Sequence, residues 1–164
     1  MIEPDAHVIA IRPITAGDAD DMRALYVFSL RANARGFVQD MSFHGDIYAR
    51  ATQYQLNKGE MLGIFIDGHL RGFGGLVRID ETAVELGKLH LHPEHQGCGL
   101  GRRLAEMLVD RARMLNYAIV RLHVTVTQAA AIGLYKKMGF VETERRVCTV
   151  LDADFDTIFM ELPL

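Results

Sequence analysis

The sequence has few cysteines, no surplus of basic charge and no long apolar run, and each shortage excludes a class of protein. Its two cysteines, Cys98 and Cys148, show neither CxxC nor metal-ligand spacing. The net charge of −3 and the absence of a lysine–arginine block argue against nucleic acid or an anionic membrane as a partner. No run is long enough to span a membrane, and the first residues contain no signal-peptide core. We therefore expect a cytoplasmic protein with reduced thiols.

The 164 residues suffice for one domain with a real core, so we expect a single domain over residues 1–164. Alternating and β-branched segments predict strands, and apolar residues at helical spacing predict four helices. A tight turn at Asp67–Gly68 divides the hairpin of residues 61–79. The element order is βαα–βββ–αβ–αββ, a mixed α/β (α+β) fold. The remaining strands are expected at 7–14, 82–93, 118–126, 140–150 and 156–164, and the helices at 16–32, 44–58, 99–115 and 128–138.

The stretch "HPEHQGCGLGRRL", residues 92–104, places three glycines where a helix should begin. Unpaired N–H groups and the helix dipole make such a turn a site for phosphate. The dinucleotide fingerprint GxGxxG would need a small residue where Arg102 stands. The P-loop would need Gly-Lys-Ser/Thr where this chain has Gly-Arg-Arg. Neither nucleotide motif is present.

A third pattern does match these residues. The segment from Gln96 to Gly101 fits Q/R-x-x-G-x-G/A and resembles the pyrophosphate loop of the GNAT acetyltransferase superfamily. "ELGKLHLHPEHQGCGLGRRL" resembles strand 4, loop and helix 3 of that family, "AAAIGLYKKMGF" its helix 4, and "DTIFMELPL" its last strand. The resemblance covers about residues 62–162. It implies the GNAT fold, a mixed and mostly antiparallel sheet of about seven strands flanked by about four helices.

The resemblance also implies an N-acetyltransferase that moves an acetyl group from acetyl-CoA to a primary amine. Backbone donors on the fourth strand would hold the thioester, with the Leu91 N–H at its carbonyl oxygen. Arg102 and Arg103 would add positive charge beside the pyrophosphate, and Gln128 replaces the usual asparagine of helix 4. The implied cofactor-binding residues are Leu89, His90, Leu91, Gln96, Gly97, Cys98, Gly99, Leu100, Gly101, Arg102, Gln128 and Tyr135.

Three residues are candidates for the proton transfers. Tyr135 occupies the position of the family's tyrosine acid, which protonates the departing thiolate. His123, with an imidazole whose ordinary pKa lies near 6.5, and Glu85 are both candidates for the base. We favour His123 because a glutamate would need burial to become comparably basic. Each of the three also has a purely structural interpretation, as a core tyrosine, a strand histidine or a solvated carboxylate.

Other interpretations stay open at this point. His90, His92, Glu94, His95 and His123 suggest a metal, but they complete no zinc motif and we expect none. Cys98 lies at a helix N-terminus, yet the resembled family transfers acetyl directly. A non-catalytic acyl-CoA-binding module is the alternative function, and nothing in the sequence demonstrates the homodimer common in this family. The sequence does not identify the acceptor. The basic residues of a segment that contains Arg31, Arg35, Phe37 and Phe43 hint at a carboxylate-bearing amino acid or small metabolite, but they fit a solvated helix end equally.

Overall fold

The computed structural model describes residues 6–32, 38–39 and 41–164, and within these the side chains of 42 and 43 are left out. Its seven strands form one sheet in the order β1-β2-β3-β4-β5-β7-β6. Every neighbouring pair is antiparallel except β4 and β5, which run parallel. The mixed, mostly antiparallel sheet predicted from the sequence is thus confirmed. The strands are β1 (Ile9–Pro13), β2 (Glu60–Ile66), β3 (His69–Arg78), β4 (Ala83–Leu91), β5 (Ile119–Thr125), β6 (Val141–Val150) and β7 (Ala153–Pro163).

The helices are α1 (Ala19–Ala32), α2 (Arg50–Leu56), α3 (Leu100–Met114) and α4 (Ala129–Lys137). The prediction of a helix over 44–58 was wrong in its first part. Gly45 adopts a left-handed φ of 71°, and the Asp46 carboxylate accepts the N–H of Ala49 in a turn, so the helix starts only at Arg50. No helix in the described ranges is long and apolar enough to cross a membrane.

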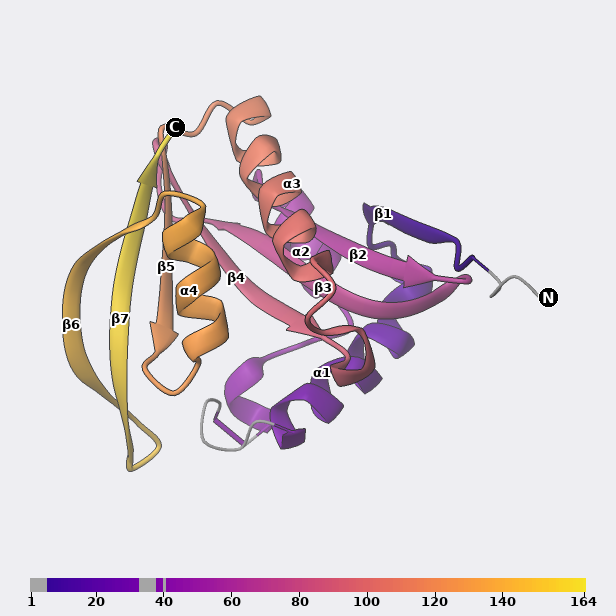
Figure 1. The fold of residues 1–164 in the computed structure, drawn as a ribbon, viewed down its shortest axis with the longest axis horizontal. Coiled ribbons are helices and arrows are strands. Elements are labelled where there is room, and N and C mark those ends of the chain that lie inside the picture. The colour runs from indigo at the N-terminus through magenta and orange to yellow at the C-terminus, as the bar shows by residue number, and fades with distance from the viewer. Residues whose placement is uncertain (1–5, 33–37, 40) are drawn as a thin grey trace.

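Two apolar cores cover the two faces of the sheet. On one face α3 and α4 pack through residues such as Leu104, Leu108 and Tyr135 against β4, β5 and β7. On the other face α1 and α2 pack through Tyr26 and Ala51 against β2 and β3. Figure 1 shows α3 and α4 in front of the sheet. Side chains of one strand alternate between the two cores, so β4 and β5 present residues to both faces.

β4 and β5 separate along their length, and this separation positions the site. They pair only from Ala83–Ile119 to Glu85–Arg121, and beyond this point Figure 1 shows them diverging. A β-bulge in β4 lies in the diverging part, where Lys88 and Leu89 stand opposite Gly74 alone. Lys88 has a left-handed φ of 55°. From residue 86 onward, the β5-facing edge of β4 therefore has no strand partner among the described residues.

Candidate active site

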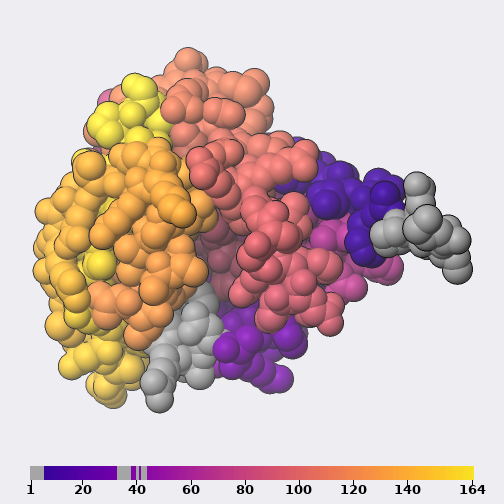
Figure 2. All heavy atoms as spheres, viewed as in Figure 1, coloured from indigo at the N-terminus to yellow at the C-terminus, as the bar shows by residue number. Residues whose placement is uncertain are grey.

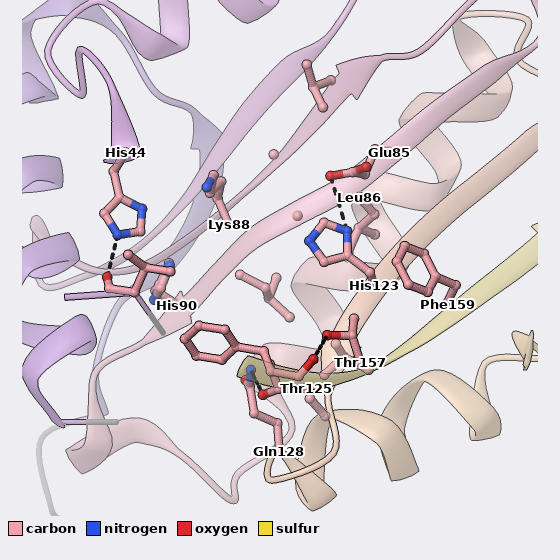
Figure 3. A pocket seen from close by; sticks show the side chains of 18 of the residues that line it. His44, Glu85, Leu86, Lys88, His90, His123, Thr125, Gln128, Thr157 and Phe159 are labelled. Carbon is pink, nitrogen blue, oxygen red and sulfur yellow. Dashed lines mark hydrogen bonds and ion pairs between the residues drawn. The ribbon is translucent and has the colours of Figure 1, made fainter. Parts of the chain in front are cut away.

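A cavity of about 420 Å³ fills the opening between β4 and β5. Its wall combines Leu89, Ala131 and Tyr135 from the α3–α4 side with Tyr26 and His44 from the α1–α2 side. Figure 3 shows polar side chains entering it from β4, β5 and β7. A cavity of this size that reaches both faces of the sheet can bring two reactants together from opposite sides.

The glycine-rich loop follows β4 and leads into α3. Gly97 and Gly99 have φ values of 79° and 85°, a backbone conformation that favours glycine. A Cβ at either position would meet nothing within 4 Å, so open space lies over the loop. The Gln96 side chain donates to the Leu91 carbonyl oxygen at 3.0 Å and ties the loop to the end of β4. Leu100 is buried and anchors the first turn of α3 in the core.

The charged and reactive side chains of the loop are exposed. Arg102 forms an ion pair with Glu106 one turn along α3, at 2.8 Å. The Cys98 thiol donates to the His95 carbonyl oxygen, and both cysteines are free. Figure 2 shows the surface hollowed between the loop and α3 on one side and α4 on the other. The N-terminus of α3, where the helix dipole is positive, thus lies on one side of this hollow, called the glycine-loop groove below.

The end of β4 supplies a backbone donor at the opening. The His92 N–H donates to the Arg71 carbonyl oxygen of the β3 segment. Because N–H groups alternate between the two edges of an antiparallel strand, the neighbouring Leu91 N–H points to the opposite edge, where β5 has diverged. The His90 side chain is buried against Tyr26 and Phe73. Burial, together with nearby Lys88, lowers the pKa of His90 to about 3, so its ring is neutral at physiological pH.

Tyr135 lines the cavity from α4. Its ring is 6% exposed and makes an edge contact with Phe140 at 5.7 Å between centroids. Burial raises the pKa of the phenol to about 12. The hydroxyl makes no hydrogen bond to any described residue. The phenol is therefore protonated throughout the physiological range and free to donate to a ligand.

His123 and Glu85 lie on the other face of the opening, on neighbouring parallel strands. The distance from His123 Nδ1 to Glu85 Oε1 is 3.7 Å, as the dashed line in Figure 3 marks. The side chain of His123 is 55% exposed and that of Glu85 33%, so water reaches both. The two residues that the sequence offered as alternative bases are thus partners in one pair.

Gln128 precedes α4 and also lines the cavity. Its side-chain amide donates to the Thr125 hydroxyl at 3.1 Å, which fixes it at the end of β5. The longer side chain is therefore held against the end of β5 in the cavity wall.

Comparison with known proteins decides the family. Residues 24–140, most of the chain, match the family model described as the acetyltransferase (GNAT) family. This protein belongs to the GNAT acetyltransferase family. It is an acyltransferase, an N-acetyltransferase that uses acetyl-CoA as co-substrate.

Relatives and solved structures agree with this membership. The [ribosomal protein bS18]-alanine N-acetyltransferase of Escherichia coli is 29% identical over 153 residues, 92% of this chain and 97% of that protein. The L-amino acid N-acyltransferase MnaT of E. coli is 32% identical over 108 residues, 65% of this chain and 60% of that protein. The structure of yncA, a putative acetyltransferase from Salmonella typhimurium with acetyl-CoA, superposes with a TM-score of 0.83 at 24% identity, over 95% of this chain and 94% of that one. The GNAT fold expected from the sequence is confirmed.

The histidines of this GNAT protein occupy different environments. His90 faces the cavity beside Tyr26, whereas His92 stacks on Phe28 of α1, with ring centroids 4.9 Å apart, and lines a separate hollow. The described residues contain no group of three His, Cys, Asp or Glu side chains that could hold a metal. Of the acceptor residues considered from the sequence, Arg31 is exposed at the end of α1. Arg35 and Phe37 lie outside the described residues, as does the side chain of Phe43.

The structure adds cavity residues that the sequence analysis did not single out. Lys88 stands inside the quoted strand-4 motif, but only the bulge turns it into the cavity. Tyr26 and His44 are far from that motif in the chain and are hydrogen-bonded to each other at 2.8 Å. Phe159 of β7 packs against His123, with centroids 5.8 Å apart. Of these residues, only the lysine had a local signal, as a cation within the quoted strand-4 motif.

Proposed function

We propose that this protein transfers acetyl directly from acetyl-CoA to a primary amine within a ternary complex, with Tyr135 as acid and His123 as base. The observation that carries the proposal is the opening between β4 and β5. It joins the face that bears Tyr135 and the glycine-loop groove to the face that bears His123 and Glu85. Donor and acceptor can therefore meet without a covalent enzyme intermediate.

Acetyl-CoA would bind along the groove and the free edge of β4. The backbone amides of residues 97–102 hold the pyrophosphate, with the α3 dipole and Arg103 adding positive charge. Gln96 supports the loop. Arg102 can contact a phosphate once its ion pair with Glu106 breaks. The Leu91 N–H donates to the thioester carbonyl oxygen, and its direction toward the opening supports this role. Leu89 and His90 contribute backbone to the same edge.

The chemistry requires two proton movements. The amine nitrogen attacks the carbonyl carbon, and its proton passes to His123, directly or through water, while Glu85 stabilises the imidazolium. The carbon–sulfur bond then breaks, sulfur takes the electron pair, and Tyr135 protonates it. The products are the N-acetylated amine and CoA with a free thiol. Protons exchanged with water return His123 and Tyr135 to their starting states.

The acceptor in our proposal is a small molecule. One relative's name describes an acyltransferase of L-amino acids and another's an enzyme acting on a ribosomal protein alanine, so both sizes of acceptor occur among similar proteins. A cavity of about 420 Å³ that must also admit the acetylated end of the cofactor favours the smaller class. We also propose a cytoplasmic location, where acetyl-CoA is supplied and the two free thiols stay reduced.

The pH dependence of kcat/KM in His123→Gln and Glu85→Gln tests the assignment of the base. Loss of the base should depress the rate and remove the acidic limb in His123→Gln, whereas Glu85→Gln should lower the rate and keep a limb. The reverse result would move the role to Glu85, and unchanged profiles in both would exclude both. Mass spectrometry of the enzyme with acetyl-CoA and no amine should show no acetylated Cys98 or Cys148; a stoichiometric acetyl-cysteine would overturn the ternary mechanism.

A further inference from the structure

The bulge in β4 decides where Lys88 points. Before the bulge Leu86 packs in the α3–α4 core, and after it Leu89 packs there. The extra residue, with its left-handed φ of 55°, shifts the alternation so that Lys88 lies on the opposite face. Its ammonium is 5.9 Å from the ring centre of Tyr26 in α1. A lysine is thus held in the part of the cavity on the α1–α2 face, called the acceptor side below because the amine would enter there. Its backbone conformation is unfavourable for any residue with a Cβ.

A second cation lies behind the same wall. Arg50 is 7% exposed, and its guanidinium is 5.2 Å from the ring centre of Tyr26. One of its terminal nitrogens donates to the His44 carbonyl oxygen, but the other, Nη1, is buried without a hydrogen-bond partner. No carboxylate among the described residues forms an ion pair with Arg50 or Lys88. Arg50 does not line the cavity, so a carboxylate bound there would feel the field of this buried cation without contacting it.

The opposite end of the acceptor side carries the proton acceptors. Figure 3 shows Lys88 on the same strand as Glu85, between the Glu85–His123 pair and His44 with His90. One end can therefore accept a proton from an amine, and the other carries positive charge that forms no ion pair with a described carboxylate. A molecule with an amine and a carboxylate a few bonds apart matches both ends.

Building on the proposed function, we propose that Lys88, reinforced by the field of Arg50, binds the carboxylate of the acceptor, and that the acceptor is a free amino acid or a close analogue. In a peptide N-terminus that carboxylate has become an amide. Such an acceptor would leave both cations without an anion, so the charge distribution favours the free amino acid over a protein terminus.

The test uses matched acceptors and matched variants. Each L-amino acid of a panel is compared with its carboxamide, its decarboxylated amine and a tetrapeptide that begins with it, by thiol release from acetyl-CoA. Lys88→Met removes the ammonium and keeps most of the stem. Lys58→Met is the control, because Lys58 has a nearly identical φ of 53° but is exposed outside the cavity. Equilibrium binding of the same molecules to the CoA complex supplies a readout that does not depend on turnover.

We expect kcat/KM for at least one amino acid to exceed that of its carboxamide by about tenfold to a hundredfold, the usual size of a charged hydrogen bond. Lys88→Met should lose this preference by lowering only the amino-acid rate, and Lys58→Met should keep it. Equal rates for acid and amide, an equal loss for both in Lys88→Met, or acetylation of the peptides alone would overturn the proposal. Carboxylate-dependent binding without any thiol release would instead overturn the proposed function and leave this subsite standing.

Discussion

Replacing Tyr135 by phenylalanine isolates the proposed acid from the packing around it. The ring is buried against Phe140, and the hydroxyl makes no hydrogen bond to a described residue. Phenylalanine fills the same space without leaving a polar partner unpaired. The fold and the affinity for acetyl-CoA should therefore change little, and the loss should appear in kcat.

The pKa of the phenol sets the size of the effect. An ordinary thiol has a pKa of about 8.5, and burial raises the pKa of Tyr135 to about 12. Complete transfer of the proton to a free thiolate would be unfavourable by about 3.5 pKa units, or roughly 5 kcal/mol. The proton must therefore move as the carbon–sulfur bond breaks, when sulfur is more basic. Loss of general acid catalysis typically costs about 10²–10⁴ in rate, and we expect Tyr135→Phe to lose that much kcat.

Two pH measurements accompany the rate. A phenol with a pKa of about 12 stays protonated between about pH 6 and 10. Tyr135→Phe should therefore lower the rate by the same factor at every pH in this range and leave the shape of the pH–rate profile unchanged. The raised pKa also predicts a stability difference. The folded state needs the neutral phenol, while the unfolded chain ionises near pH 10, so wild-type stability falls between pH 10 and 12. Tyr135→Phe should not show this fall of about 3 kcal/mol in the free energy of unfolding, which is measured by comparing denaturation of the two proteins between pH 10 and 12.

An equal kcat in both proteins, under conditions where chemistry limits the rate, would refute the role of Tyr135 as acid. A loss of kcat together with an altered pH profile would show that the phenol titrates in the assay range, against the pKa derived from its burial. A large fall in stability at neutral pH would assign the hydroxyl to structure instead.

Two further predictions concern the loop and the cavity wall. Gly99→Val should lose acetyl-CoA affinity in calorimetry, because a side chain at a φ of 85° would occupy the open space over the loop. The control is Gly68→Val in the β2–β3 turn, where φ is 82° and the space is equally open; it should lose similar stability but keep its affinity for acetyl-CoA. Equal affinity of the two variants for acetyl-CoA would refute the pyrophosphate assignment. His90→Phe should remove an acid-induced loss of stability. The imidazole has a pKa of about 3 in the fold and about 6.5 in the unfolded chain, so wild-type stability falls as the pH drops below 6.5, by about 2 kcal/mol at pH 5. Identical acid denaturation of the two proteins would contradict a buried neutral imidazole.

Local features of this chain could be predicted from its sequence. The glycine loop is local, because the positive φ values of Gly97 and Gly99 and the start of α3 involve neighbours in the chain. The Asp67–Gly68 turn is local in the same sense, and both residues have the positive φ that such a hairpin turn requires. These signals, with the match to helix 4, sufficed for the fold and the family.

Features that depend on strand pairing could not be predicted in the same way. The bulge that turns Lys88 into the cavity exists only relative to Gly74 on β3, and the sequence alone indicated one uninterrupted strand. The Glu85–His123 pair depends on the short parallel register between β4 and β5, so the two residues appeared as rivals. The unpaired Nη1 of Arg50 depends on packing between α2 and α1, for which no local pattern exists.

Amine-dependent release of CoA thiol tests the central claim most directly. Wild-type protein is mixed with acetyl-CoA, calorimetry confirms binding, and free thiol is followed with and without a panel of primary amines that includes amino acids. Thiol release that requires an amine and produces its N-acetyl derivative in equal amount is the predicted result. Binding of acetyl-CoA with no amine-dependent release for any acceptor would contradict the account and leave a non-catalytic acyl-CoA-binding module.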